Sequence, residues 1–292
     1  MQVTTNNRTF NVEAFFIDLD GTLFDKWNKK ISKKNIEAIH AIQKDIPFII
    51  STGRSYSNKV KKIMHLLNIK YAICQNGSLI VDDEGNVIKN ITLNKEQVTK
   101  IVNITRQQRL GFTINSEFLI YSNYWLFAPF RFLWRKKWKP IKKYQYKENV
   151  VNKIVIAGLI RAKKVWSLSE KIHKEVSGVS VKTSGRDKII EITDKSATKG
   201  KGAQLIANIL NINIENTVHI GDSENDTTTL NKVGALIAVK NSSIKLLNVA
   251  THIGVSVVEH TISISLFNTF TFGLTLNLLS NLTLNIIKSS TV

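Results

Sequence analysis

The sequence predicts an α/β protein in which a second domain is inserted into a domain built on a parallel sheet. Short apolar runs at 15–17, 48–50 and 71–74 alternate with segments of helical periodicity, and this βαβαβ order builds a parallel sheet. Between about residues 78 and 188 the pattern changes, and the alternation returns at 189. We therefore expect the chain to leave the first domain and come back to it.

The first predicted strand, Phe15-Phe16-Ile17, ends in two carboxylates. A continuous apolar run is typical of a strand covered on both faces of its sheet, and Asp18 and Asp20 follow it, ahead of Gly21. Glycine permits a sharp turn, and ligands of open parallel sheets bind beyond the carboxyl ends of the strands. These residues alone fit a ligand-binding edge or an ordinary solvated turn, so the rest of the chain must decide.

Each later element has a local signal. Ser32 is a preferred helix cap, and isoleucines follow it at 36, 39 and 42, which is helical spacing. Pro47 precedes the second strand. The elements predicted before the insertion are a strand at 15–17, a helix after Ser32, a strand at 48–50, a helix at 56–67 and a strand at 71–74. Those predicted after it are a strand at 189–192, a helix at 199–210 and strands at 217–220, 235–239 and 251–254.

The inserted segment begins beside a predicted hairpin. Apolar runs at 79–81 and 87–88 flank the turn-forming residues 82–86, as the two strands of a hairpin do. The predicted domains are 1–82 for the first part of the core, 83–188 for the inserted domain, 189–260 for the second part of the core and 261–292 for an apolar C-terminal tail whose role stays open.

The polar residues near these strand ends suit phosphoryl transfer. Asp18 can attack phosphorus, and Asp20 can protonate the leaving oxygen and later deprotonate a water molecule. The phosphoryl oxygens need compensating positive groups. The candidates for holding them are Thr52, Gly53, Lys199 and Asn225, and those for contacting the rest of the substrate are Arg54 and Asn76.

The same carboxylates are candidate ligands of Mg²⁺, which prefers oxygen ligands and needs few of them from the protein. Asp18, Asp222 and the backbone carbonyl of Asp20 fit as direct ligands. Asp226 and Asn225 would orient the Asp222 carboxylate or metal-bound water without binding the ion themselves. Both residues also fit a plain helix cap. Lys199 alone fits a solvated lysine in a basic run, and Arg54 fits a solvated helix start equally well.

Four motifs in order resemble the haloacid dehalogenase superfamily of phosphohydrolases, in its type IIB, Cof-like branch. They are Asp18-Leu19-Asp20-Gly21-Thr22, Ser51-Thr52-Gly53-Arg54, Ala197-Thr198-Lys199-Gly200 and Gly221-Asp222-Ser223-Glu224-Asn225-Asp226. The resemblance implies a Rossmann-like core, an α/β cap of type C2B between the second and third motifs, and Mg²⁺-dependent hydrolysis of phosphomonoesters, often sugar phosphates. Lys240 and Ser242 depart from the family's usual Met-Gly-Asn-Ala segment, outside the predicted site.

The charge balance narrows the partners. With 41 basic and 22 acidic residues, the formal net charge is +19, which attracts anions such as phosphate esters, nucleic acid or anionic lipid. The leading hypothesis is a phosphatase of small phosphorylated metabolites, with no obligate nucleic acid. The alternatives are a phosphomutase of the same fold, or a basic protein that binds nucleic acid or an anionic surface.

Some segments carry less information. The aromatic and basic stretch 121–147 fits cap packing, a substrate-gripping surface or a binding patch, and the uncharged run 261–287 has too many polar residues for a transmembrane span. The polar N-terminus, 1–11, lacks a secretory core, so we expect a cytoplasmic protein. Cys74 and His219 are expected to be packed core residues. The oligomeric state stays open.

Overall fold

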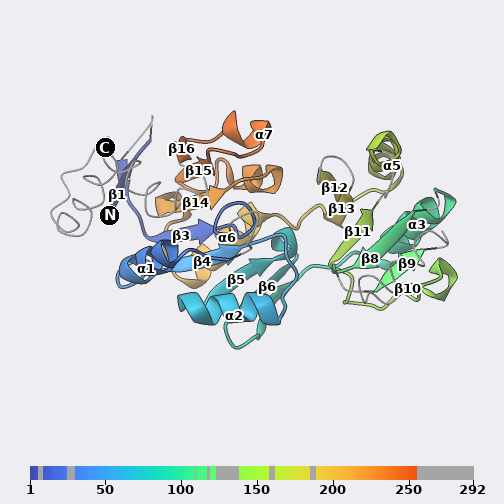
Figure 1. Cartoon of the computed structure of the whole chain (residues 1–292), viewed down its shortest axis with the longest axis horizontal. Helices are drawn as coiled ribbons and strands as arrows, with labels where there is room; N and C mark the ends of the chain where they lie inside the picture. Colours follow the sequence, from blue (N-terminus) through green and yellow to red (C-terminus); the bar gives the residue numbers. More distant parts are fainter. Residues whose placement is uncertain are drawn as a thin grey trace.

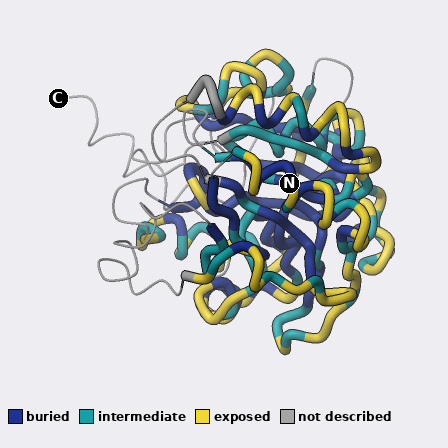
Figure 2. Tube along the Cα trace, turned by 90° about the vertical axis from the view of Figure 1, so that its right-hand side faces the viewer, coloured by how far each residue is buried: buried dark blue, intermediate teal, exposed yellow. Residues whose placement is uncertain are grey.

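The chain folds into two lobes joined by two crossings (Figure 1). The computed structural model describes residues 1–5, 9–24, 30–108, 110–116, 119–122, 138–157, 162–184 and 189–254. Buried residues form the inner strands, and exposed residues lie on the surrounding segments (Figure 2).

The first lobe, the core, is built on one mixed sheet. In spatial order its strands in the described chain are β16 (His252–Gly254), β15 (Ala235–Val239), β14 (Thr217–Gly221), β3 (Ala14–Ile17), β4 (Phe48–Ser51), β5 (Tyr71–Cys74), β6 (Leu79–Asp82) and β7 (Val87–Asn90). The pairs from β16 to β5 are parallel, and β6 and β7 are antiparallel to their neighbours. Its helices are α1 (Lys33–Ile42), α2 (Asn58–Leu67), α6 (Lys199–Ile209) and α7 (Ile244–Leu247).

Apolar side chains alternate between the two covered faces of this sheet. Phe15 and Ile17 pack with residues of α1 and α2, such as Ile39, whereas Phe16 packs with Ile206 of α6. All four residues of β3 are buried, because each face of the sheet has its own layer of helices. The parallel order and double covering agree with the predicted α/β class.

The second lobe, the cap, has its own sheet. In spatial order the strands are β10 (Trp138–Lys139), β9 (Ile120–Ser122), β8 (Gly111–Ile114), β11 (Lys153–Ala157), β13 (Ile189–Asp194) and β12 (Val179–Ser184), with helices α3 (Lys95–Gln107) and α5 (Ala162–Glu175). A separate apolar cluster holds α3, α5 and this sheet together. The chain therefore carries a second α/β unit within the core sequence, as expected.

Sheet membership differs from the prediction at both crossings. Strand β7 pairs with β6 in the core sheet, so the core continues past 82. Strand β13 pairs with β11 and β12 in the cap sheet, so the cap continues past 188. A strand pattern shows which residues are extended, but it does not show which sheet supplies the partner. A further pair, β1 (Gln2–Thr4) with β2 (Thr9–Asn11), lies in the segment expected to be a polar terminus.

Two predicted segments fall largely outside the described residues: most of the aromatic and basic stretch 121–147, and the tail 261–292. Within the described chain, no helix combines the length and apolar character that a membrane crossing requires.

Cys74 lies at the end of β5 with no solvent exposure, as expected for a packing residue. Burial raises the pKa of its thiol to about 12, so little thiolate forms near neutral pH. We expect iodoacetamide at pH 8 to leave Cys74 unmodified in the folded protein and to alkylate it in urea, as read by intact mass. Rapid alkylation without denaturant would contradict this packing.

Candidate active site

Three aspartates from two motifs meet at the edge of the core sheet. Strands β3 and β14 are parallel neighbours, and the Asp18 backbone N–H donates to the Ile220 carbonyl at 2.9 Å. As a result, one carboxylate oxygen from each of Asp18, Asp222 and Asp226 lies within 4.8 Å of the other two. Such a group of hard oxygen donors is suited to a divalent cation.

Lys199 connects two of these carboxylates. It is the first residue of α6, whose N-terminal cap is Thr198, and its side chain has no solvent exposure. Its Nζ lies 2.6 Å from Asp18 Oδ1 and 2.7 Å from Asp226 Oδ1. Burial alone would lower the pKa of Lys199, but the two carboxylates raise it above its usual value. Lys199 is therefore a buried cation, not a solvated member of a basic run.

At the Asp18 carboxyl, the effect of burial on the pKa exceeds that of the neighbouring positive charge. Burial raises its pKa well above the usual value, and Lys199 only partly offsets this, while the charges of Asp226 and Asp222 raise it further. An anionic Asp18 therefore depends on nearby positive charge.

Asp226 is held by several donors. Besides Lys199, its carboxylate accepts the backbone N–H groups of Ser223 at 3.0 Å and Asp222 at 3.2 Å. His219 Nε2 lies 2.7 Å from Asp226 Oδ1. Burial alone would raise the pKa of Asp226, but Lys199 first and then His219 hold it well below its usual range.

His219 is the residue for which the sequence interpretation was incomplete. It is buried in β14, as expected, and burial lowers its pKa, so a neutral ring contacts Asp226. Sequence pattern could not indicate this contact, because it depends on how residues 222–226 fold after β14 ends.

Asp20 and Arg54 form a two-point ion pair. Arg54 Nε and one terminal nitrogen each lie 2.5 Å from a different carboxylate oxygen of Asp20. The hydrogen bond to Asp20 raises the pKa of Arg54, and the guanidinium also lies 5.1 Å from the centre of the Phe24 ring. The sequence left two roles open for Arg54, substrate contact or solvation of a helix start. The structure shows a third role, since Arg54 holds the Asp20 carboxylate.

The candidate phosphate-binding residues lie close by but differ in position. Asn225 donates to Asn76 Oδ1 at 2.8 Å, and both line the same cavity as Gly53. Thr52 is buried and its hydroxyl accepts the Arg54 backbone N–H at 3.2 Å, so in this arrangement it supports the turn and does not line the cavity.

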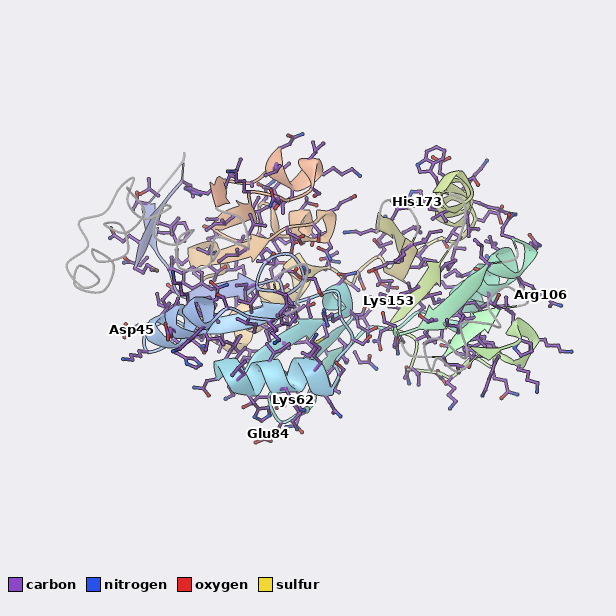
Figure 3. All side chains as sticks on the ribbon, in the orientation of Figure 1. Asp45, Lys62, Glu84, Arg106, Lys153 and His173 are labelled. Atoms are coloured by element: carbon purple, nitrogen blue, oxygen red, sulfur yellow. The ribbon has the colours of Figure 1, made fainter. Side chains whose placement is uncertain are left out.

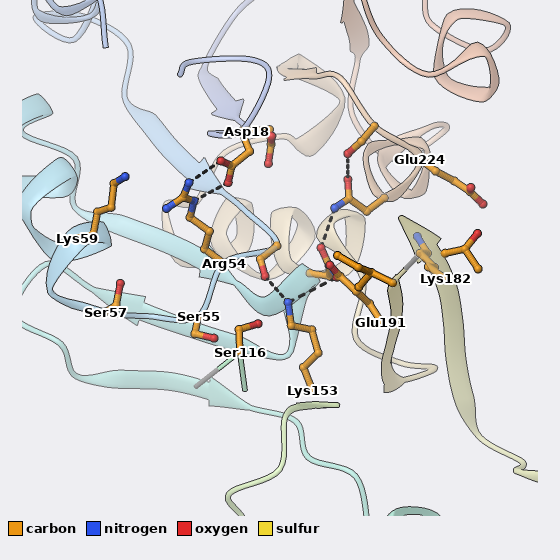
Figure 4. A pocket seen from close by; sticks show the side chains of 17 residues that line it. Asp18, Arg54, Ser55, Ser57, Lys59, Ser116, Lys153, Lys182, Glu191 and Glu224 are labelled. Atoms are coloured by element: carbon orange, nitrogen blue, oxygen red, sulfur yellow. Dashed lines mark hydrogen bonds and ion pairs between the residues drawn. The ribbon is translucent and has the colours of Figure 1, made fainter. Parts of the chain in front are cut away.

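A cavity of about 820 Å³ lies between the core and the cap. The core contributes Asp18, Asp20 and Arg54, and the cap contributes Lys153, Lys182 and Glu191 among others (Figure 4). The volume is within the range of small-molecule sites. No motif marks the cap residues, so they were missed by sequence analysis.

Contacts across this cavity tie the cap to the core. Lys153, between the two lobes in Figure 3, donates to the Gly53 carbonyl at 2.7 Å. Asn76 donates to Glu191 Oε2 at 3.1 Å, and the Ser55 hydroxyl donates to the Asn115 carbonyl.

The comparisons with known proteins agree with this arrangement. A family model described as haloacid dehalogenase-like hydrolase matches residues 15–266. The chain belongs to the haloacid dehalogenase-like hydrolases. The resemblance inferred from the four motifs is thereby confirmed, since the matched segment contains all of them.

Among curated relatives of this family, Phosphatase YwpJ of Bacillus subtilis is 24% identical over 84% of this chain and 95% of its own. Phosphoglycolate phosphatase of Methanothermobacter thermautotrophicus is 21% identical over 83% and 91%. The solved sugar phosphatase BT4131, of subclass IIB, has a TM-score of 0.73 at 18% identity, covering 89% of this chain and 100% of that one. The chain is a phosphatase of the haloacid dehalogenase type with the core-and-cap fold.

One glycine of the first motif tests the aspartate cluster. Gly21 has φ +84°, and a Cβ built there would lie 2.0 Å from Asp222 Oδ2. Gly21→Ala is expected to displace the Asp222 carboxylate and to lower stability by about 1–2 kcal/mol, because alanine disfavours positive φ. Urea unfolding and Mg²⁺ binding by calorimetry would check both effects. A variant with unchanged stability and metal affinity would show that the close approach is unimportant.

Proposed function

We propose that this chain hydrolyses small phosphomonoesters, sugar phosphates or similar metabolites, with Mg²⁺, through an aspartyl-phosphate on Asp18. The proposal rests mainly on one observation: residues from the first, third and fourth motifs converge on Asp18, where Lys199 lies 2.6 Å from Oδ1. This arrangement supplies a nucleophile and a positive charge at the same point.

Asp18 would attack phosphorus with a carboxylate oxygen. Lys199 occupies Oδ1, so Oδ2 is the candidate attacking atom. A bond forms from Asp18 to phosphorus as the bond from phosphorus to the ester oxygen breaks. Lys199, a fixed cation in a dry site, would compensate charge on the transferred group.

Asp20 would move the protons. In the first step it gives a proton to the departing ester oxygen, and in the second it takes one from the water that attacks the phosphorus of the aspartyl-phosphate. Phosphate then leaves and the Asp18 carboxylate is restored. Arg54, bound to both oxygens of Asp20, would orient this carboxylate and must yield an oxygen when Asp20 carries the proton.

The residues present fit a divalent cation. The aspartate cluster is partly to fully buried, and a side chain at Gly21 would invade it. Asp18, Asp222 and the Asp20 backbone carbonyl would hold Mg²⁺. Asp226 would position Lys199 and the backbone of residues 222–223. When bound, the ion supplies positive charge that lets an anionic nucleophile approach an anionic ester.

The cap would help to keep bulk water from the site. Its contacts with Gly53 and Asn76 bring the cap sheet over the cavity, and exclusion of water strengthens the electrostatic interactions inside. A cytoplasmic location stays a prediction from the sequence.

The test is phosphate release from a panel of phosphomonoesters, including sugar phosphates and phosphoglycolate, measured with Mg²⁺ and with EDTA. We expect release that depends on Mg²⁺. A phosphomutase, the alternative of the same fold, would isomerise sugar phosphates without free phosphate. Absence of release and isomerisation from folded protein would contradict the proposal.

A further inference from the structure

The cap contributes a cation to the cavity that the chemistry above does not use. Lys182 lies on β12 and lines the cavity together with Asp18 and Arg54 (Figure 4). It also lines a small adjoining cavity of about 30 Å³ with Lys199 and Asn225. Its position therefore borders both the reacting centre and the space that a leaving group would fill.

The other cations lining this cavity in the described chain already have close partners. Arg54 is paired with Asp20, Lys153 donates to the Gly53 carbonyl, and Lys59 lies 5.0 Å from the centre of the Phe24 ring. Lys182 makes no hydrogen bond or ion pair with any residue in the described part of the chain.

Three carboxylates whose charges act on Lys182 have other partners: Glu191, Glu224 and Asp226, the last of which binds Lys199. Glu191 is opposite Lys182 in the β12–β13 register, but its Oε2 accepts from Asn76 at 3.1 Å and lies 3.5 Å from Lys153. Glu224 lies 3.0 Å from Lys245. Burial lowers the pKa of Lys182, and the charge of Glu224 opposes this only in part. Lys182 is thus a partly desolvated cation whose charge an incoming anion would compensate.

We infer that Lys182 selects substrates whose leaving group carries a second anionic group, a carboxylate or a second phosphate, in addition to the phosphoryl group that reacts. This inference rests on the proposed phosphatase function and specifies its substrate class. The reacting phosphoryl group is placed by Asp18 and Lys199, which leaves Lys182 for the far end of the molecule. Lys182 is thus a specificity-determining residue.

The sharpest probe is a pair of substrates that differ in one group. In 3-phosphoglycerate a carboxylate stands where glycerol 3-phosphate has a hydroxymethyl group. A charge-assisted hydrogen bond changes affinity by about 10- to 100-fold. We expect kcat/KM to favour 3-phosphoglycerate, and we expect Lys182→Met to reduce that preference by about tenfold or more. Fructose 1,6-bisphosphate against fructose 6-phosphate tests a phosphate as the second anion in the same way.

Two variants separate local recognition from general attraction. Lys182→Arg keeps the charge and should keep most of the preference. Lys174→Met removes an equal charge from an exposed position on α5 and should leave the preference unchanged. The inference is overturned if Lys182→Met preserves the preference in both pairs, or if Lys174→Met lowers it equally.

The wild-type protein separates failure of this inference from failure of the proposed function. Turnover of glycerol 3-phosphate or p-nitrophenyl phosphate establishes the phosphatase, and an unchanged preference then overturns the inference alone. If no ester is hydrolysed, calorimetric binding of the two three-carbon esters to Asp18→Asn, with and without Lys182→Met, tests the anion subsite directly. Equal affinities in both proteins would overturn it.

Discussion

Asp18→Asn is expected to abolish turnover and to leave the protein folded. Asparagine has nearly the same size, but its amide is not a nucleophile toward phosphorus. The loss in kcat should be about 10⁴-fold or more. The fold should persist because Lys199 keeps its second partner, Asp226, and because a neutral amide avoids the cost of burying the Asp18 carboxylate, whose pKa burial raises.

The measurement is kcat on the best substrate of the panel, with thermal unfolding followed by circular dichroism. Asp45→Asn is the matched control, because Asp45 is exposed on the core lobe, far from the cavity (Figure 3), and should leave kcat unchanged. Activity above about one per cent of wild type in Asp18→Asn, with contaminating phosphatase excluded, would make Asp18 untenable as the nucleophile.

Lys199→Met should have the largest effect on stability. The change leaves Asp18 and Asp226 buried without the cation that lies 2.6 and 2.7 Å from them. Removing one partner from a buried ion pair costs about 3–5 kcal/mol, and loss of a positive group at the phosphoryl site should lower kcat by about 10²–10³-fold. Urea unfolding and steady-state kinetics measure the two effects.

A second change makes this prediction more specific. Lys199→Met combined with Asp226→Asn removes one of the two stranded carboxylates, so the pair should be less destabilising than the sum of the single changes. Residues in direct contact typically couple by about 0.5–3 kcal/mol. Additive effects, or a Lys199→Met protein as stable as wild type, would show that the buried pairs contribute little.

The pH dependence follows from the same groups. In wild type the pKa of Asp226 lies below its usual value, so its contribution to stability is present above the unfolded pKa and lost as the pH falls through the folded one. Without Lys199, the pKa of Asp18, which burial already raises in wild type, would rise further, and burial would raise the pKa of Asp226. The stability difference between Lys199→Met and wild type should therefore shrink on acidification from neutral pH.

Residues that directly follow a strand could be located from the sequence, because the apolar pattern of that strand fixes where they lie. The run at 15–17 predicts a buried strand, and the strand fixes where Asp18 lies. The fourth motif follows the same logic for Asp222, which comes directly after β14. Lys199 reaches the same site in another way, because β13 before it belongs to the cap sheet and Lys199 opens helix α6 of the core.

Other features depend on contacts between distant segments. Whether β7 and β13 join the core or the cap is decided by strand pairing, not by the pattern within each strand. Lys182 and Lys153 reach the cavity only because the cap sheet lies over the core. The contact of His219 with Asp226 is closer in sequence, but it depends on how the loop after β14 folds. No spacing along the sequence indicates these contacts.

The most direct test of the central claim is chemical trapping of the phosphorylated enzyme. Wild-type protein is mixed with ³²P-labelled substrate, quenched in acid within one turnover and reduced with borohydride, which converts an aspartyl-phosphate to homoserine. We expect transient label in the protein and homoserine at position 18, with neither in Asp18→Asn. Label at another residue, or phosphate released from a competent enzyme with no labelled protein at any time, would contradict it.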